Sequence, residues 1–322
     1  MIAFIDARRD RFGVEPICRV LSEHGWEIAP NTYWVARKRP RSKRAVRDAA
    51  LIGEIERVYA QNLCVYGADK LWAQLNREGI GVARCTVERL MRLRGLCGAR
   101  RGRAFTVTTR PDDRGDRPAD LVARRFGAPA PNRLWVADVT SCPTRSGMVY
   151  VAFVIDAYSR RVLGWRAATS MTTTLVLDAV EQAIWVRARD GIADLTGLVH
   201  HTDAGSQYTS IAFTDRLAVA GVDPSVGSVG DAFDNALAES EIGLFKTDLI
   251  KPRGPWRTAE QVEIATLEYV DWSNHHRLYQ VCGDIPPAEL ERAYYRHHAA
   301  LAEVGQSTIW VSGLTGAIHS RT

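Results

Sequence analysis

The sequence contains no long hydrophobic run. No uninterrupted apolar stretch approaches the ~20 residues that a membrane-spanning helix needs. The N-terminus, MIAFID at positions 1–6, becomes charged too early for a signal peptide. These two absences exclude an integral membrane protein and a secreted protein, and we expect a soluble protein of the cytoplasm.

Metal-binding cysteine patterns are also absent. The six cysteines (18, 64, 85, 97, 142 and 282) include no C-x-x-C pair and show no metal-ligand spacing. The histidine pairs at 200–201, 275–276 and 297–298 lack the nearby cysteines of a zinc module. We therefore expect reduced or buried thiols, with neither a disulfide nor zinc.

The chain has 322 residues, of which 46% are hydrophobic, and this is enough for one large domain or two. Its charge is distributed unevenly. Residues 1–126 contain 26 Lys and Arg against 15 Asp and Glu, a net charge of +11, whereas the remainder contains 16 against 22, a net charge of −6. This asymmetry predicts that the first part binds a polyanion and the second binds cations. A solvated arginine-rich surface without a partner is the alternative.

Residues 1–46 are interpreted as an N-terminal helical arm followed by a basic linker. A short helix is expected at 15–21, then a turn at Gly25 and a second helix from Asn31. The two helices would form either a small helix-turn-helix or an arm that packs on a partner. Clustered positive charge and a proline favour the linker at 38–44.

Residues 47–98 are predicted to form a helix-turn-helix domain. Helical periodicity recurs at 51–61, 68–78 and 84–93, with a glycine-containing turn before the third helix. That helix has an apolar inner face and a cationic outer face, as a major-groove helix requires. Three amphipathic helices also form small domains without nucleic acid, so the helices alone leave both readings open. The inward residues are Val87, Leu90 and Met91, and the outward, DNA-binding candidates are Arg84, Arg89 and Arg92.

Residues 99–131 contain prolines and arginines, which predict a basic interdomain linker that can follow a DNA backbone. A core at 132–295 and a C-terminal tail at 296–322 follow. A strand meander, a crossover helix and a further strand predict an α/β sheet with helices on both faces. The expected strands are 134–140, 147–156, 161–168, 198–202 and a short one at Val222, and the expected helices are 173–189, 211–220, the Glu239 helix, 258–274 and one that opens at Pro286.

Three acids are placed where they could meet. Asp138 lies in the first predicted strand, and Asp203 directly follows the fourth. Glu239 lies in the first turns of a helix that Asp234 and Asn235 are suited to cap. We expect one cluster. Each acid alone also has a structural interpretation, as a strand-edge residue, a turn residue or a charge at a helix N-terminus.

Four separated motifs carry a family resemblance: WVADVT at 135–140, HTDAGSQY at 201–208, DNALAES at 234–240 and IPPAE at 285–289. In addition, 35 residues separate Asp203 from Glu239, and Lys246 lies seven residues after the glutamate. By these motifs and spacings the chain resembles the transposases of the insertion sequence three family, specifically the second-reading-frame product, which has a DDE integrase catalytic core. The resemblance covers nearly the whole chain, and it departs at Glu241, where the family has an apolar residue.

The resemblance implies an RNase H-like catalytic core preceded by an all-α helix-turn-helix region. It implies a DNA transposase that cleaves and transfers the strands of insertion-sequence ends by in-line phosphodiester displacement. Asp138, Asp203 and Glu239 would be both the catalytic residues and the ligands of two Mg²⁺ ions, for which Mn²⁺ can substitute. Lys246 returns to the face of Glu239 at ~100° per residue and is expected to bind DNA.

The expected partners are insertion-sequence ends, target DNA, further copies of the chain on DNA, and the product of the upstream reading frame, to which family members are usually fused. The expected location is the bacterial cytoplasm, in association with the nucleoid. Two alternatives stay open: a DNA-binding-only derivative, inactive or repressor-like, and an RNase H-like nuclease without strand transfer. Asp156 is interpreted as a turn initiator rather than a fourth ligand.

Overall fold

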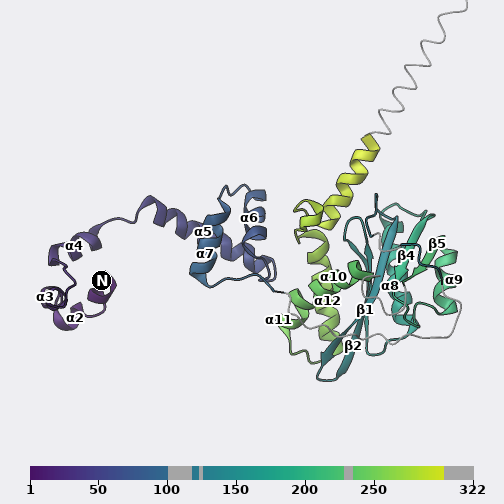
Figure 1. Cartoon of the computed structure of the whole chain (residues 1–322), viewed down its shortest axis with the longest axis horizontal. Helices are drawn as coiled ribbons and strands as arrows, with labels where there is room; N and C mark the ends of the chain where they lie inside the picture. The colour runs from purple at the N-terminus through teal and green to yellow at the C-terminus, as the bar shows by residue number, and fades with distance from the viewer. Residues whose placement is uncertain (101–117, 123–125, 228–234, 301–322) are drawn as a thin grey trace, which may run out of the picture. The chain divides into compact units, whose positions relative to one another are not determined.

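The computed structural model describes residues 1–100, 118–122, 126–227 and 235–300 (Figure 1). Contacts divide the chain into two compact units, Met1–Glu56 and Arg57–Thr322. The boundary predicted after residue 46 falls inside helix α5 (Lys43–Gln61). Most of the predicted linker at 99–131 and most of the predicted tail at 296–322 lie outside the described residues.

The first unit contains a small helical cluster. Its apolar side chains include Ile5, Ile17 and Tyr33, all buried, and the Tyr33 hydroxyl donates a hydrogen bond of 2.7 Å to Asp6 Oδ1. Helices occur where the sequence predicted two of them, and the turn at Gly25 adopts the left-handed φ of 83° that glycine tolerates. Two short helices before them were not predicted. The helices are α1 (Ile2–Asp6), α2 (Arg9–Phe12), α3 (Val14–Glu23) and α4 (Pro30–Lys38).

The three helices predicted between 47 and 98 are confirmed as α5, α6 (Ala68–Arg77) and α7 (Arg84–Arg94). Helix α5 begins earlier than expected and includes part of the predicted basic linker, because lysine, arginine and alanine are good helix formers. The turn before α7 contains Gly79 with a left-handed φ of 82°. The inward residues of α7 are buried as predicted: Val87, Leu90 and Met91.

A five-stranded sheet forms the centre of the second unit, with the strand order β3-β2-β1-β4-β5. Strand β2 runs antiparallel to β1 and β3, whereas β1, β4 and β5 are parallel. The predicted meander and the parallel fourth strand are confirmed, and the first strand extends four residues further than expected. The strands are β1 (Leu134–Thr144), β2 (Gly147–Asp156), β3 (Val162–Ala168), β4 (Leu198–Thr202) and β5 (Val222–Val226).

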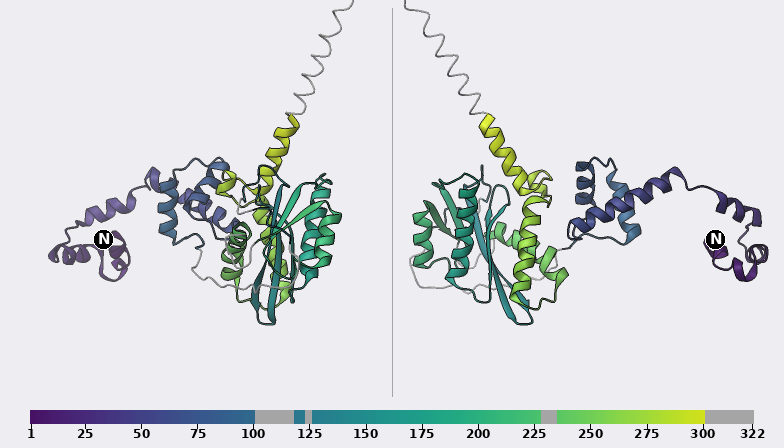
Figure 2. Two further views of the ribbon diagram at one scale, coloured as in Figure 1. Left: turned by 45° about the vertical axis from the view of Figure 1, so that its right-hand side comes forward. Right: turned by 180° about the vertical axis from the view of Figure 1, so that it is seen from behind.

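Helices cover both faces of the sheet, as the sequence predicted (Figure 2). Helices α8 (Thr173–Arg189) and α9 (Ile211–Val219) lie on one face, and α10 (Ala236–Phe245) and α12 (Ala259–His275) lie on the other. Helix α8 approaches β3 closely at Gly164, where an added Cβ would lie 1.9 Å from the carbonyl oxygen of Ala179. Only glycine fits there, because any side chain would push α8 off the sheet.

The remaining segments continue the second face. Phe245 of α10 packs edge-on between Phe153 of β2 and Tyr269 of α12, with ring centroids 5.0 and 5.2 Å away. These contacts fix α10 against the sheet, and α10 continues directly into the next helical turns. The further helical segments are η2 (a π-helix, Lys246–Ile250), α11 (Lys251–Arg253), η3 (a 3₁₀ helix, Gln280–Cys282) and a helix at 287–300.

Asp156 initiates the turn after β2, as predicted. Its Oδ1 accepts backbone hydrogen bonds of 3.0 Å from both Tyr158 and Ser159. Its Oδ2 accepts one of 3.2 Å from the buried guanidinium of Arg187, which also donates bonds of 2.7 and 2.8 Å to Glu291. This buried network ties the helix at 287–300 to the sheet, so Asp156 has a structural role.

All six cysteines lie among the described residues as free thiols, three of them buried. Among the described residues, no helix has both the length and the apolarity needed to cross a membrane.

Candidate active site

Asp138 comes from the central strand of the sheet. It follows Ala137, which faces the apolar layer beneath α8, so the alternation of the strand directs Asp138 to the opposite face. Its Oδ1 accepts a hydrogen bond of 2.7 Å from the backbone N–H of Val139. Burial, followed by the negative charge of Asp203 and then that of Glu239, raises the pKa of Asp138 to about 8. The three acids therefore lie close enough for their charges to interact.

Asp203 lies beside Asp138 because of the strand register. Strands β1 and β4 are parallel neighbours, and Val136 pairs with His201. Asp138 lies two residues further along β1, and Asp203 lies two residues further along the chain, just beyond the end of β4, so the two acids are at the same level of the sheet. Asp203 Oδ1 also accepts a hydrogen bond of 3.2 Å from the backbone N–H of Gly205. The residue thus fills both of the roles that the sequence offered, a turn residue and a member of the acidic group.

Glu239 is exposed in the first turn of α10. Asn235 stands at the N-cap position of this helix, but its side chain makes no capping hydrogen bond. Its amide Nδ2 instead donates a hydrogen bond of 3.0 Å to the carbonyl oxygen of Ala137 in β1. The predicted capping role of Asn235 was therefore wrong, because a strand carbonyl takes the side chain, and Asp234 lies outside the described residues. The bond places the start of the glutamate helix beside Asp138.

Lys246 follows the helix of Glu239 and is the first residue of the π-helical segment η2. Its positive charge opposes the rise in the pKa of Asp138, which places the ammonium group in the same local field as the three acids. The side chain is partly exposed and lines a cavity between the last residues of β1 and the segment that follows α10. π-Helical turns inside α-helices occur often at functional sites.

The donor chemistry of the acids suits a divalent ion. Carboxylate oxygens are the ligands that Mg²⁺ prefers, and a cation among them would relieve the repulsion that raises the pKa of Asp138. In the part of the chain that the structure describes, however, no group of three or more His, Cys, Asp or Glu side chains is close enough to hold a metal ion. The charges of the three acids influence one another, but in this structure their side chains are not close enough to bind one metal ion together.

Glu241 belongs to a different network from Glu239. The Tyr279 hydroxyl donates a hydrogen bond of 3.0 Å to Glu241 Oε2, and burial raises the pKa of Glu241 while the charge of Arg277 lowers it. Arg277 in turn donates bonds of 2.7 and 3.2 Å to Asp248 Oδ2. Sequence reasoning missed this buried network, although the departure from the family at Glu241 was a signal for it.

The arginines of α7 carry the predicted cationic face. Arg84 and Arg92 are exposed, with 52% and 76% of their side-chain surface accessible, and Arg89 is partly buried. Glu88 lies between the exposed two, 3.8 Å from Arg84 and 3.1 Å from Arg92, and Arg84 also pairs with Asp69. The face is therefore basic, but its charge is partly neutralised within the helix.

Comparison with known proteins identifies the family. The model for "Integrase core domain" matches residues 128–232, and the model for "HTH-like domain" matches residues 46–104. The "Putative transposase for insertion sequence element IS986/IS6110" of Mycobacterium tuberculosis H37Rv is 62% identical over 268 residues, which cover 83% of this chain and 96% of the relative. The chain belongs to the insertion sequence three family of transposases.

Two further relatives of this transposase agree. The "Transposase for insertion sequence element IS629" of Shigella sonnei is 48% identical over 302 residues, covering 92% of this chain and 97% of the relative. The "Transposase InsF for insertion sequence IS3A" of Escherichia coli K12 is 28% identical over 292 residues, covering 89% and 97%. The protein is thus a DNA transposase, a DDE polynucleotidyl transferase with an RNase H-like integrase core and an N-terminal helix-turn-helix-like region that implies DNA binding.

Sequence reasoning did not single out three residues of a cavity at the far end of β1: Arg145, Lys251 and Trp256. They line the same cavity as Lys246. The run KPRGPWR at 251–257, in which cations and an aromatic residue alternate with prolines, was the available signal. These residues were missed because the hairpin that brings Arg145 to them is a tertiary feature.

Proposed function

We propose that Asp138, Asp203 and Glu239 are the catalytic residues with which this transposase cleaves and joins insertion-sequence ends. The observation that supports this most directly is the raised pKa of Asp138, caused by its burial and then by Asp203 and Glu239. A strand, a strand end and a helix contribute one acid each. Because holding like charges close together is costly, three unrelated elements converge in this way mainly where positive charge is to be bound.

Two Mg²⁺ ions held by the three carboxylates would supply an activated attacking oxygen and a neutralised leaving oxygen. The dependence on divalent metal follows from the integrase core family, and the number and kind of ions are part of our proposal. Lys246 holds the DNA phosphate next to the acids, and Asn235 keeps the helix of Glu239 against β1.

No protein nucleophile takes part in this chemistry. The attacking group is water in cleavage and a 3′-hydroxyl of DNA in joining, and each displacement occurs in line at one phosphorus. A covalent protein–DNA intermediate is therefore not formed, and the reaction needs only metal-bound acids and correctly positioned DNA.

Recognition of the ends is assigned to the first part of the chain. Arg84, Arg89 and Arg92 of α7 contact DNA in the major groove, and the +11 charge of residues 1–126 holds the backbone. The chain acts as an oligomer on DNA in the bacterial nucleoid, together with or fused to the upstream-frame product. The isolated chain is then expected to bind specific ends poorly, and efficient end pairing by it alone would refute this dependence.

One experiment separates the three candidate functions. The chain, alone and with the upstream-frame product, is incubated with the element's own ends and flanking DNA in Mg²⁺, and the products are searched for nicks and end-to-end joined circles. A transposase produces both, a nuclease produces nicks without joints, and a DNA-binding-only derivative produces neither.

A further inference from the structure

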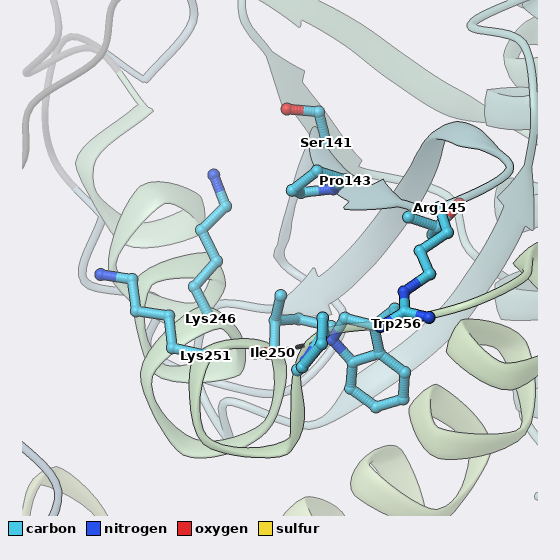
Figure 3. Close-up of a pocket in the computed structure, with 10 residues that line it drawn as sticks. Ser141, Pro143, Arg145, Lys246, Ile250, Lys251 and Trp256 are labelled. Carbon is cyan, nitrogen blue, oxygen red and sulfur yellow. Dashed lines mark hydrogen bonds between the residues drawn. The ribbon is translucent and has the colours of Figure 1, made fainter.

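A cavity of about 550 Å³ lies between the last residues of β1 and the segment that follows α10 (Figure 3). One wall comes from the end of β1 and the turn after it, and the other comes from η2, α11 and the residues after them. The lining residues are Ser141, Pro143, Thr144, Arg145, Lys246, Ile250, Lys251, Gly254, Pro255 and Trp256.

The floor of the cavity is apolar and firmly held. Trp256 is 9% exposed, and its indole N–H donates a hydrogen bond of 2.9 Å to the carbonyl oxygen of Ile250. The backbone N–H of Arg145 donates one of 3.0 Å to the carbonyl oxygen of Trp256, and that of Ser146 donates one of 3.1 Å to Arg257. The β1–β2 turn and the tryptophan are thus joined through the backbone, so the aromatic ring has a fixed position.

Cations surround this floor. Of the ten lining residues, three are cationic and none is acidic. Figure 3 shows the ammonium groups of Lys246 and Lys251 on one side and the guanidinium of Arg145 on the other. An apolar floor that includes an indole, with cations on two sides, fits a nucleotide. The base would contact the indole, and the phosphates would contact the cations.

The distance between the cavity and the acids indicates which nucleotide of the DNA could reach the cavity. Lys246 lies seven helical residues beyond Glu239, about 10 Å at 1.5 Å per residue. Ser141 lies three strand residues beyond Asp138, also about 10 Å at ~3.3 Å per residue. Trp256 lies further away, because it bridges to Thr144, six strand residues beyond Asp138, which is about 20 Å at ~3.3 Å per residue. One DNA strand advances about 3.4 Å per nucleotide, so the cavity begins about three nucleotides from a phosphate held at the acids and reaches Trp256 after about six.

We propose that this cavity receives one unstacked base of the insertion-sequence end, about six nucleotides from the scissile phosphate. Trp256, Ile250 and the prolines hold the base, while Arg145 and Lys251 hold the phosphates on either side. The inference rests on the proposed function, because the acids set the position of the scissile phosphate. The extracted base loses its stacking in the duplex, and contact with the tryptophan offsets this loss.

Photochemical cross-linking of the wild-type chain, together with the upstream-frame product, tests this without a mutation. End duplexes carry one 5-iodouracil at each position up to about eight nucleotides on either side of the scissile phosphate, and the cross-linked residue is located by mass spectrometry. The proposal predicts cross-links to Trp256 from one position about six nucleotides from the cut. Cross-links that appear elsewhere while none reaches Trp256 or its cavity neighbours would overturn it.

A binding cycle with abasic DNA provides the second test. Trp256→Leu should weaken binding of the intact end roughly ten- to a hundred-fold, the range expected for one stacked base. On an end that is abasic at the cross-linked position, the same substitution should cost nothing further. Equal losses on intact and abasic ends would contradict the inference. Trp185→Leu is the matched control, since Trp185 is 60% exposed on α8, on the other face of the sheet.

A third variant protects the test against misfolding. If Trp256→Leu lowers the melting temperature by more than a few degrees, Lys251→Ala replaces it, because Lys251 is exposed. Binding and cross-linking are measured without Mg²⁺ and do not require cleavage. A chain that cleaves ends but forms no cross-link at the cavity refutes only this inference, and a chain that cross-links but never cleaves refutes only the catalytic assignment.

Discussion

The side-chain amide of Asn235 lies 3.0 Å from the carbonyl oxygen of Ala137 and donates a hydrogen bond to it across 98 residues of sequence. Ala137 immediately precedes Asp138, and Asn235 immediately precedes the helix of Glu239. One buried hydrogen bond therefore links the two elements that carry the first and third acids. The spacing between these acids depends on it more than on any local helix cap.

We expect Asn235→Ala to reduce cleavage far more than DNA binding. The substitution leaves the buried carbonyl of Ala137 without its partner, at a cost of about 1–3 kcal/mol, and releases the start of α10. Cleavage rate and end affinity are measured in parallel, and the rate should fall at least tenfold while the affinity is unchanged. A variant as active as the wild type would show that the bond does not position Glu239.

Asp203→Asn is expected to abolish strand cleavage and to preserve end binding. The amide keeps the shape of the side chain and can still accept the hydrogen bond of Gly205, but it loses the charge that a metal ligand needs. The measurement is a gel assay of cleavage in Mg²⁺ beside a binding assay without it. Cleavage at the wild-type rate would remove Asp203 from the site.

Replacing Arg92 by glutamine should weaken DNA binding and make it less sensitive to salt. Each phosphate contact that is lost reduces the slope of log K against log[salt] by about one. The matched control is Arg189→Gln, since Arg189 is also exposed but lies on α8, in the core. Titrations at several salt concentrations give both slopes, and identical slopes for the two variants would place α7 away from DNA.

His200 should make the fold sensitive to acid. It is fully buried, burial and then the charge of His201 lower its pKa to about 3, and neither ring nitrogen has a hydrogen-bond partner among the described residues. In the unfolded chain the imidazole of His200 binds a proton near pH 6.5, whereas in the folded chain it stays neutral at that pH. Stability is therefore lost as the pH falls below 6.5. The loss is about 1.4 kcal/mol per pH unit.

His200→Leu removes this titration together with the two unpaired ring nitrogens. Between pH 6.5 and 4.5 its free energy of unfolding should therefore fall less steeply than that of the wild type, by about one proton in slope. Denaturant unfolding at several pH values measures this. Parallel curves for the two proteins would mean that the buried imidazole is protonated in the folded state.

The elements of the core could be predicted because their signals are local. Strand β2 is a nearly continuous apolar run, β1 and β4 begin with apolar residues, and α8 shows helical periodicity, so these local patterns were enough to locate them. The parallel placement of Asp138 and Asp203 followed from the same reasoning, since a strand and the end of its neighbour share one edge of the sheet.

What could not be predicted depends on partners distant in sequence. Asparagine is a residue type that often caps helices, and only the folded chain brings the Ala137 carbonyl to Asn235. Arg145 and Trp256 form one cavity because a backbone hydrogen bond joins the β1–β2 turn to a later segment. Likewise, the sequence marks Glu241 only as a departure from the family, and its hydrogen-bond partner Tyr279 lies 38 residues away.

The pair Glu239 and Glu241 tests the central assignment most directly. We expect Glu239→Gln to abolish Mg²⁺-dependent cleavage of the ends. Glu241→Gln should retain most of it, because glutamine still accepts the Tyr279 hydrogen bond and burial already favours a neutral side chain there. Both variants should bind end DNA as the wild type does. Loss of cleavage in Glu241→Gln with activity retained in Glu239→Gln would contradict the account and place the third acid elsewhere.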